Sequence, residues 1–218
     1  MRTPGRIAAL ILAAGRSSRM GFPKPLLQVG NCSALEKAVN CFYLAGIEDV
    51  RVIVGHRADE VIPLVNRLNA KWVFNESFQE GMLSSVLTGV RSLEPGIEAF
   101  FLLPVDVPLV KQNTVEECLR IYRGRGAKVV YPCFQGLQGH PPLIERGCVA
   151  ELTAGCRGGL RAFLERYRPE AAYVNVLDRG VVMECNTPEE YRKVWAYSQR
   201  EDIPTERECD GQVHECSF

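Results

Sequence analysis

The sequence predicts an α/β fold in which helices cover both faces of a mostly parallel β-sheet. Short apolar runs occur at residues 7–12, 50–54 and 99–105, and the second of these is rich in β-branched residues. Longer segments with the hydrophobic spacing of helices separate these runs. Such alternation is typical of parallel sheets with right-handed crossovers, whose ligands bind beyond the carboxyl ends of the strands. We therefore expect a Rossmann-like three-layer sandwich.

The chain has the size and composition of one domain. It contains 218 residues, of which 46% are hydrophobic and 24% are charged, and this is enough material for a single core. We expect residues 1–199 to form that domain. Beyond it, acidic residues outnumber basic ones and apolar residues are few. Residues 200–218 are therefore expected to form a mobile acidic tail.

Charge and cysteine content exclude several classes of function. Lys plus Arg equals Asp plus Glu at 26 each, which argues against a nucleic acid or an anionic membrane as partner. No apolar run approaches the roughly 20 residues of a membrane span. The nine cysteines include no Cys-x-x-Cys pair, so reduced thiols are favoured over a disulfide framework. We expect a cytoplasmic protein whose anion-binding sites are local.

The other elements are expected in order along the chain. The expected helices cover 34–44, 58–68, 82–90, 112–122 and 160–167, and a last one begins after Thr187. The expected strands after the first are 50–54, 72–74, 99–105, 128–131 and 181–186, with an irregular hairpin over 132–144. Ser33 and Glu36 form a predicted capping box, and Asn113 is expected to cap helix 112–122. The run 99–105 is the most apolar and is placed at the sheet centre.

The loop after the first strand has the features of a phosphate-binding site. Ala13, Ala14 and Gly15 place little bulk on the backbone, so an anion can approach bare N–H groups. Three cations follow these small residues: Arg16, Arg19 and Lys24. Neither Gly-x-x-x-x-Gly-Lys-Ser/Thr nor Gly-x-Gly-x-x-Gly is present. The loop is therefore predicted to bind a triphosphate in a different manner from those two motifs.

Polar oxygens follow two of the expected strands. Asp106 comes directly after strand 99–105 and just before Pro108, and Asn186 ends the expected strand 181–186. Carboxylate and amide oxygens at strand ends are suited to Mg²⁺. For Asn186 two interpretations stay open, because its side chain could bind the metal or could tie off the turn before the helix that Thr187 caps.

Several ordered motifs resemble one family. The segment Leu12-Ala13-Ala14-Gly15-x-x-x-Arg19-Met20-Gly21-x-x-Lys24 resembles the signature of the MobA-like NTP transferases, which activate sugar phosphates and the molybdenum cofactor. The Ala-Ala-Gly form followed by Lys24-Pro25-Leu26-Leu27 is similar to the molybdenum cofactor cytidylyltransferase branch. Later matches are Gly81-Met82-Leu83-Ser84-Ser85, Val105-Asp106-Val107-Pro108 and Gly139-His140-Pro141. The resemblance covers roughly residues 5 to 197 and implies the nucleotide-diphospho-sugar transferase type of fold.

The resemblance assigns roles to individual residues. The implied catalytic residues are Arg19, Lys24 and Asp106. The implied nucleotide-binding residues are Leu12, Ala13, Ala14, Gly15, Arg16, Lys24, Gly81, Ser84 and Ser85. The implied metal ligands, for Mg²⁺, are Asp106 and Asn186. The implied acceptor-binding residues are His140, Arg157 and Arg161.

The implied reaction is transfer of CMP from CTP to the terminal phosphate of molybdopterin, with release of pyrophosphate. A molybdoenzyme that receives the product is an implied partner. Two alternatives in the same class are guanylyl transfer and transfer to a sugar or alditol phosphate. Glu184 and Asn186 replace two aspartates of the family pattern, and Val105 replaces a glycine. These departures keep open a different class of function, a non-catalytic nucleotide sensor or cofactor chaperone.

Overall fold

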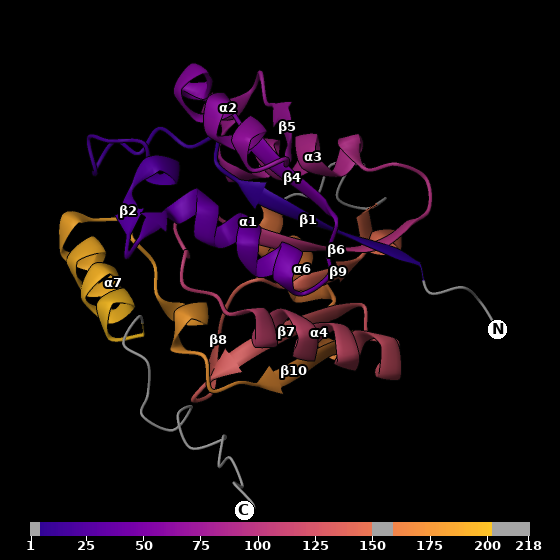
Figure 1. The fold of residues 1–218 in the computed structure, drawn as a ribbon. Coiled ribbons are helices and arrows are strands. Elements are labelled where there is room, and N and C mark those ends of the chain that lie inside the picture. The colour runs from indigo at the N-terminus through magenta and orange to yellow at the C-terminus, as the bar shows by residue number, and fades with distance from the viewer. Residues whose placement is uncertain (1–4, 150–158, 202–218) are drawn as a thin grey trace, which may run out of the picture.

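The structure, a computed structural model, describes residues 5–149 and 159–201, which form a three-layer α/β sandwich (Figure 1). The strands of the main sheet are β1 (Arg6–Leu12), β4 (Asp49–Val54), β5 (Lys71–Phe74), β6 (Ile97–Pro104), β7 (Val129–Phe134), β8 (Leu137–Gln138), β9 (Leu143–Glu145) and β10 (Ala171–Asn175). Their order is β10-β7-β9-β6-β1-β4-β5, and β8 pairs with β7. Only β8 and β9 pair antiparallel with their neighbours. The predicted mostly parallel sheet is confirmed.

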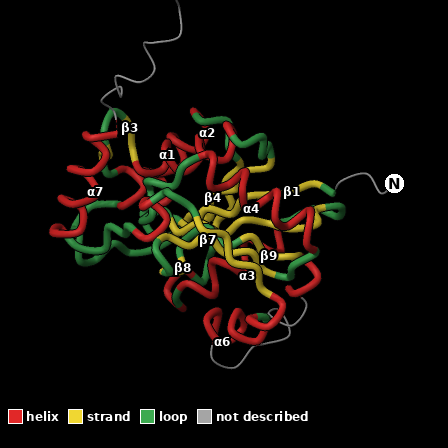
Figure 2. The backbone as a smooth tube through the Cα atoms, turned by 90° about the horizontal axis from the view of Figure 1, so that it is seen from below, coloured by secondary structure: helices red, strands yellow, loops and turns green. Residues whose placement is uncertain are grey.

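Helices cover both faces of this sheet. They are α1 (Ala34–Leu44), α2 (Ala58–Arg67), α3 (Met82–Ser92), α4 (Gln112–Arg125), α6 (Gly159–Arg166) and α7 (Pro188–Glu201). Buried residues of α1, α2 and α4 share one core cluster with the sheet, and those of α3 and α6 share another. Figure 2 shows α6 on the opposite side of the strands from α1 and α2. Among the described residues, no helix combines the length and apolar character needed to span a membrane.

The helix α7 packs away from the main sheet, against a small hairpin of β2 (Gln28–Val29) and β3 (Cys32–Ser33). Val194 of the helix and Val29 of the hairpin are both buried in a third apolar cluster. The helix continues to Glu201, two residues past the predicted domain boundary, and residues 202–218 of the expected tail lie outside the described residues.

The sheet centre lies at β6 and β1, as their sequences predict. Residues 8–11 and 99–103 are all at most 2% exposed. A strand that is covered on both faces needs apolar side chains at every position, because neither face meets water. The two strands pair in parallel register from Ile7 with Ala99 to Leu12 with Pro104. Their carboxyl ends therefore stop side by side at one edge of the sheet.

The segment before α7 differs from the prediction, because residues 181–186 are not a strand. Asp178 Oδ1 accepts a hydrogen bond from the Gly180 N–H at 2.9 Å, and the 3-10 turn η5 (Arg179–Val182) begins there. A Cβ on Gly180 would collide with the Leu109 carbonyl, so the turn packs directly on backbone. Val181 and Cys185 are thus buried without strand pairing: the Val181 carbonyl accepts from the His140 N–H, and the Cys185 N–H donates to the Asp106 carbonyl.

The start of α4 also differs from the prediction. The N-cap position belongs to Lys111 and not to Asn113, and Lys111 supplies no capping side chain. Asp178 Oδ2 instead accepts hydrogen bonds from the Lys111 N–H at 2.8 Å and from Thr114 Oγ1 at 2.7 Å. A carboxylate from a distant segment therefore accepts a hydrogen bond from a backbone N–H at the helix start, which has no partner within the helix. The N-cap side chain usually supplies this acceptor. Asp178 holds η5 and α4 together.

Two stretches are more regular than the sequence suggests. The edge strand β10 was not predicted; it pairs in parallel with β7 and alternates buried and exposed side chains. Residues 132–144, expected to be irregular, extend β7 and form β8 and β9 around a turn at Gln135 and Gly136 with positive φ. These residues are regular because β9 lies between β6 and β7 and pairs with both strands.

The amino end of the sheet is closed by a charged network. Asp49 and Arg51, both on β4, have side chains only 5% exposed and contact each other at 2.7 Å. Lys71 lies 3.2 Å from Asp49, and Glu94 lies 3.4 Å from Arg51. Burial alone would raise the pKa of Asp49, but the hydrogen bonds and charges of Arg51 and Lys71 hold it below its ordinary value. Asp49 is therefore ionised at neutral pH.

We predict that Asp49→Asn lowers the free energy of unfolding by about 3–5 kcal/mol at pH 7, because Arg51 stays buried without its main counter-charge. Since the pKa of Asp49 is lowered on folding, its stabilisation is lost as the pH falls through that pKa. The variant should therefore lose less stability than the parent on acidification below about pH 4. Urea unfolding across this pH range measures both effects. Glu94→Gln, at a half-exposed position, is the control and should cost clearly less.

Candidate nucleotide-binding site

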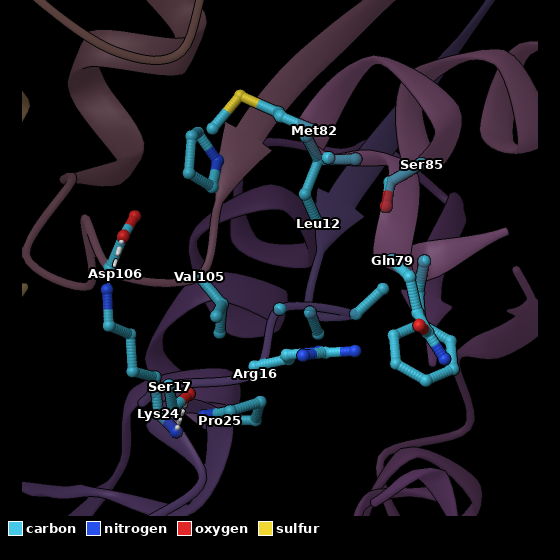
Figure 3. Close-up of a pocket in the computed structure, with 16 residues that line it drawn as sticks. Leu12, Arg16, Ser17, Lys24, Pro25, Gln79, Met82, Ser85, Val105 and Asp106 are labelled. Atoms are coloured by element: carbon cyan, nitrogen blue, oxygen red, sulfur yellow. Dashed lines mark hydrogen bonds and ion pairs between the residues drawn. The ribbon is translucent and has the colours of Figure 1, made fainter. Parts of the chain in front are cut away.

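A cavity of about 470 Å³ opens at the carboxyl ends of β1 and β6 (Figure 3). Its lining comes from the loop after β1, the loop and helix after β5, and the end of β6. Lys24 and Asp106 lie at one end of the cavity, Gln79 and Ser85 lie at the other, and the Arg16 side chain extends between them. The position matches the strand-end location predicted for an α/β ligand site.

The loop after β1 is held against β4 by its backbone. The Ala13 N–H donates to the Ile53 carbonyl at 2.8 Å, and the His56 N–H donates to the Ala14 carbonyl at 3.2 Å. A Cβ on Gly55 would lie within 3 Å of the Cβ atoms of Phe78 and Ala14. This glycine therefore lets the walls of the cavity approach each other.

The structure brings most of the predicted nucleotide-binding residues together. Those that line the cavity are Leu12, Ala13, Ala14, Gly15, Arg16, Lys24, Gly81 and Ser85. Ser84 does not line it, but its hydroxyl donates toward the carbonyls of Ser77 and Gly81 at 2.8 Å each. Seven further lining residues received no site role from the sequence: Ser17, Pro25, Phe78, Gln79, Met82, Pro104 and Val105.

Asn75, which follows β5 and is 1% exposed, organises the wall that carries these residues. Its Nδ2 donates to the hydroxyls of Ser84 and Ser85 at 2.9 and 3.0 Å. Its Oδ1 accepts from the Ser77 N–H at 3.0 Å and from Thr88 Oγ1 at 3.2 Å. The amide thus ties the loop after β5 to the first two turns of α3. The signal that could have identified it is its place directly after a strand, as for Asp106.

The two predicted metal ligands meet at Lys24. The Lys24 Nζ donates to Asp106 Oδ2 at 2.8 Å and to Asn186 Oδ1 at 2.6 Å. Asn186 Nδ2 donates in turn to Glu184 Oε2 at 2.6 Å. The side chains of Lys24 and Asp106 are only 14% and 20% exposed. An ammonium therefore sits at the point toward which two hard oxygen ligands are directed, and we name these three residues the Lys24 junction.

Backbone contacts after β6 bring Asn186 to the junction. The N–H of the neighbouring Cys185 donates to the Asp106 carbonyl at 2.8 Å, and the thiol of Cys185 lies 3.3 Å from the same oxygen. Burial, with the charge of Asp106, raises the pKa of Cys185 to about 12, so this thiol stays protonated and can donate. The two contacts fix the backbone of the Asn186 segment beside the end of β6.

The turn before α7 is secured without the Asn186 side chain. Glu190 Oε2 accepts from the N–H groups of Asn186 and Thr187 at 2.8 and 3.1 Å, and the Glu190 N–H donates to Thr187 Oγ1 at 3.2 Å. The prediction that Thr187 caps this helix is confirmed, and Glu190 completes a capping box with it. Of the two interpretations of Asn186, the arrangement favours a ligand-directed side chain over one that ties off the turn.

The donor set at the junction fits a hard divalent cation. A carboxylate oxygen and an amide oxygen both face one nitrogen, and a second carboxylate lies behind the amide. Among the described residues no group of three or more His, Cys, Asp and Glu side chains could hold a metal ion. The residues therefore fit Mg²⁺ or Mn²⁺ that takes one or two protein oxygens and completes its coordination with water and phosphates.

His140, just before β9, is near the same end of the sheet. Burial lowers its pKa, although the charges of Glu184 and Asp106 oppose this effect. The imidazole is therefore neutral at neutral pH. Its Nδ1 is buried and has no hydrogen-bond partner within the described part of the chain, which leaves it able to bond a ligand or water. Its contact with the acceptor stays a prediction.

Of the arginines predicted from the sequence, Arg19 and Arg161 do not line the cavity. Arg19 is exposed on the turn of residues 17–21 and does not line the cavity. Arg161 is exposed on α6 and does not line it either, and Arg157 lies outside the described residues. The roles of Arg19 and Arg161 stay predictions. Arg16 is the arginine whose side chain enters the cavity (Figure 3).

Sequence comparisons give matches over most of the chain. A family model described as the MobA-like NTP transferase domain matches residues 9–171. A molybdenum cofactor cytidylyltransferase from Escherichia coli is 27% identical over 146 residues, which cover 66% of this chain and 73% of the relative. A nicotine blue oxidoreductase from Paenarthrobacter nicotinovorans is 29% identical over 169 residues, which cover 73% and 82%. Longer bifunctional relatives also match, and this chain spans only 29% and 26% of two of them.

Solved structures share the fold. The crystal structure of Rv0371c from Mycobacterium tuberculosis H37Rv superposes with a TM-score of 0.76 over 89% of this chain and 100% of that one, at 24% identity. A second structure of that protein is titled a complex with manganese. These likenesses show that this chain has the fold of that protein.

We predict that Asn75→Ala lowers the free energy of unfolding by about 2 kcal/mol, because the Ser77 N–H and the hydroxyls of Ser84, Ser85 and Thr88 lose a partner. It should also weaken nucleotide binding severalfold, since the wall that carries Gln79 and Ser85 loosens. Urea unfolding and calorimetric titration measure the two effects. Asn66→Ala, at an exposed position of α2, is the control and should change neither. Unaltered nucleotide affinity in a destabilised Asn75→Ala variant would contradict the role given to this wall.

Proposed function

We propose that this chain, which belongs to the MobA-like NTP transferase domain family, transfers CMP from CTP to the terminal phosphate of molybdopterin and releases pyrophosphate. Nucleotidyl transfer is the general activity that membership of this family supports. The observation that carries the proposal is the Lys24 junction at one end of a cavity that begins in a phosphate-binding loop. A triphosphate placed along the loop would have its reacting phosphate near Asp106.

The reaction needs positioning and charge neutralisation more than acid–base catalysis. An oxygen of the acceptor phosphate forms a bond to the α-phosphorus of the nucleotide, and the bond from that phosphorus to pyrophosphate breaks. The second pKa of a phosphate monoester is about 6, so the acceptor is already largely ionised at neutral pH. No residue has to remove a proton. The protein has to hold two anions together and stabilise the charge on the departing pyrophosphate.

The residues divide this work among them. Backbone N–H groups of residues 14–17 and the Arg16 guanidinium would hold the triphosphate. Lys24 would move its hydrogen bonds from the junction to phosphate oxygens when the nucleotide binds. Asp106 and Asn186 would then hold Mg²⁺, which when bound neutralises phosphate charge and polarises the α-phosphate. Arg19, which does not line the cavity, would help to attract the triphosphate from outside it.

The choice of CTP and of molybdopterin rests on two observations. The Ala13-Ala14-Gly15 form of the loop resembles the cytidylyl branch, and the curated relative from Escherichia coli carries that activity in its name. The cytoplasmic location and a recipient molybdoenzyme belong to the same proposal.

A pyrophosphate-release screen tests this function. The purified protein with Mg²⁺ is offered each of the four common nucleoside triphosphates, together with molybdopterin or with glucose 1-phosphate. We predict turnover with CTP and molybdopterin, and a loss of about 100-fold or more in Asp106→Asn, which keeps its shape but not its charge. Faster turnover with GTP, or with the sugar phosphate, would replace the proposal by one of its alternatives. Nucleotide binding without turnover under all conditions would indicate a sensor or chaperone.

Substitutions at Asn186 test the metal role. We predict that Asn186→Asp keeps or strengthens Mg²⁺ binding in the presence of CTP, because it adds a negatively charged oxygen. Asn186→Ala should raise the Mg²⁺ concentration at half-saturation by about tenfold or more, because it removes one of two protein ligands. Magnesium titrations of activity, with melting curves alongside, measure this. An Ala variant with an unchanged magnesium requirement and a lower melting temperature would assign Asn186 to the turn alone.

A further inference from the structure

The Lys24 junction places a cation of the protein on the two oxygens that a divalent metal would also need. The Lys24 Nζ lies 2.8 Å from Asp106 Oδ2 and 2.6 Å from Asn186 Oδ1. Figure 3 shows the lysine side chain extending from the loop to Asp106. A metal ion that binds both oxygens has to lie between them, and the ammonium is already there. The metal and the lysine therefore compete for one place.

Two cations cannot share these oxygens. A divalent ion needs oxygen ligands at about 2.0–2.6 Å, so it would either displace the ammonium or lie very close to it. Like charges at such a distance repel strongly where protein partly excludes water, and the side chains of Lys24 and Asp106 are only 14% and 20% exposed. The ammonium also cancels the charge of Asp106, which would otherwise attract a metal. The junction in this arrangement is therefore a poor metal site.

The other carboxylates near the junction do not bond the lysine. Glu184 Oε2 accepts from the nitrogen of the Asn186 amide, while Lys24 bonds the amide oxygen. Glu190 Oε2 accepts from the backbone N–H groups of Asn186 and Thr187. Both carboxylates keep their charge, and Glu184 is exposed, so water and salt screen it. Among the described residues, Asp106 is the carboxylate that the lysine covers.

The same lysine is tied to the phosphate-binding loop. Its backbone N–H donates to Ser17 Oγ at 3.2 Å, and Ser17 lines the nucleotide cavity. Pro23 and Pro25 restrict the backbone on both sides of Lys24. Its side chain is a flexible four-carbon stem, so the Nζ can turn away from Asp106 while the backbone stays in place. A triphosphate in the loop therefore offers the ammonium a second set of anionic oxygens.

We propose that Lys24 keeps the divalent metal out of the nucleotide-free protein and frees Asp106 and Asn186 only when a triphosphate is bound. Lys24 is in this respect a positioning residue with two alternative partners, the junction oxygens and the phosphate oxygens. The nucleotide then binds before the metal or together with it. This inference rests on the proposed function, because it takes Asp106 and Asn186 as the metal ligands.

Manganese binding by the nucleotide-free protein tests the inference without turnover. Mn²⁺ accepts carboxylate and carbonyl oxygens as Mg²⁺ does, and its electron paramagnetic resonance signal measures the free ion. We expect Lys24→Met to bind Mn²⁺ at least about tenfold more tightly than the parent, because the competing charge is gone and Asp106 is uncovered. Lys24→Gln, a second neutral variant, should show the same gain. Lys24→Arg keeps the charge and should stay close to the parent.

Two further variants locate the effect. Lys24→Met combined with Asp106→Asn should lose the gain, because Asp106 is the carboxylate that the lysine covers. Lys37→Met makes the same substitution on α1, at a lysine that does not line the nucleotide cavity, and should leave the Mn²⁺ affinity unchanged. Melting curves show whether each variant is folded.

Three results would overturn the inference. The first is a nucleotide-free parent that binds Mn²⁺ as tightly as Lys24→Met does. The second is a folded neutral variant at position 24 that gains no affinity, and the third is a gain that survives Asp106→Asn. Because the measurement contains neither nucleotide nor acceptor, the inference can fail while CMP transfer to molybdopterin succeeds, and it can hold where pyrophosphate release is not observed.

Discussion

The Lys24 junction is the contact on which the rest of the site depends. Two oxygens from residues 82 and 162 positions away in the sequence meet on one ammonium. Without a cation at this point the partial negative charge of the Asn186 amide oxygen would face Asp106 directly, and the carboxylate of Glu184 would lie just behind it. A cation in a partly buried setting offsets that repulsion more strongly than it would in water. The junction therefore holds three segments of the chain in a geometry suited to a divalent metal.

Stability and function are separated between the two ends of the sheet. At the amino end, Asp49 and Arg51 are buried and satisfied by charged neighbours, which closes that end. At the carboxyl end, the strands stop beside small residues and polar side chains, and the cavity opens there. In parallel sheets only one end presents the loops that follow the strands, so binding residues collect at that end and stabilising ones can occupy the other.

The substituted family positions have a consistent physical explanation. Glu184 and Asn186 stand where the resembling family has two aspartates. In this chain the amide bridges Lys24 and Glu184, donating to one carboxylate while accepting from the ammonium. An aspartate at 186 could not donate in this way. The pair thus keeps one oxygen directed at Lys24, with a carboxylate behind it and one negative charge fewer than two aspartates would carry.

The sequence by itself determined the elements that depend on local patterns. The apolar runs at β1 and β6 set the sheet centre, the capping boxes at Ser33 and Thr187 set two helix starts, and the small residues after β1 marked the loop of the cavity. Asp106 could also be found, because an acid directly after a buried strand has a defined place in a parallel sheet. In each case neighbouring residues carry the information.

Only the tertiary structure decided how distant segments meet. The sequence of residues 181–186 predicts a strand. Two tertiary contacts instead begin a turn there: Asp178 bonds the Lys111 N–H at the start of α4, and Gly180 packs against the Leu109 carbonyl. The position of Lys24 between Asp106 and Asn186 likewise joins parts of the chain that no local pattern connects. The physical reason is that such contacts are selected by packing and by the need to satisfy buried polar groups, which depend on the whole fold.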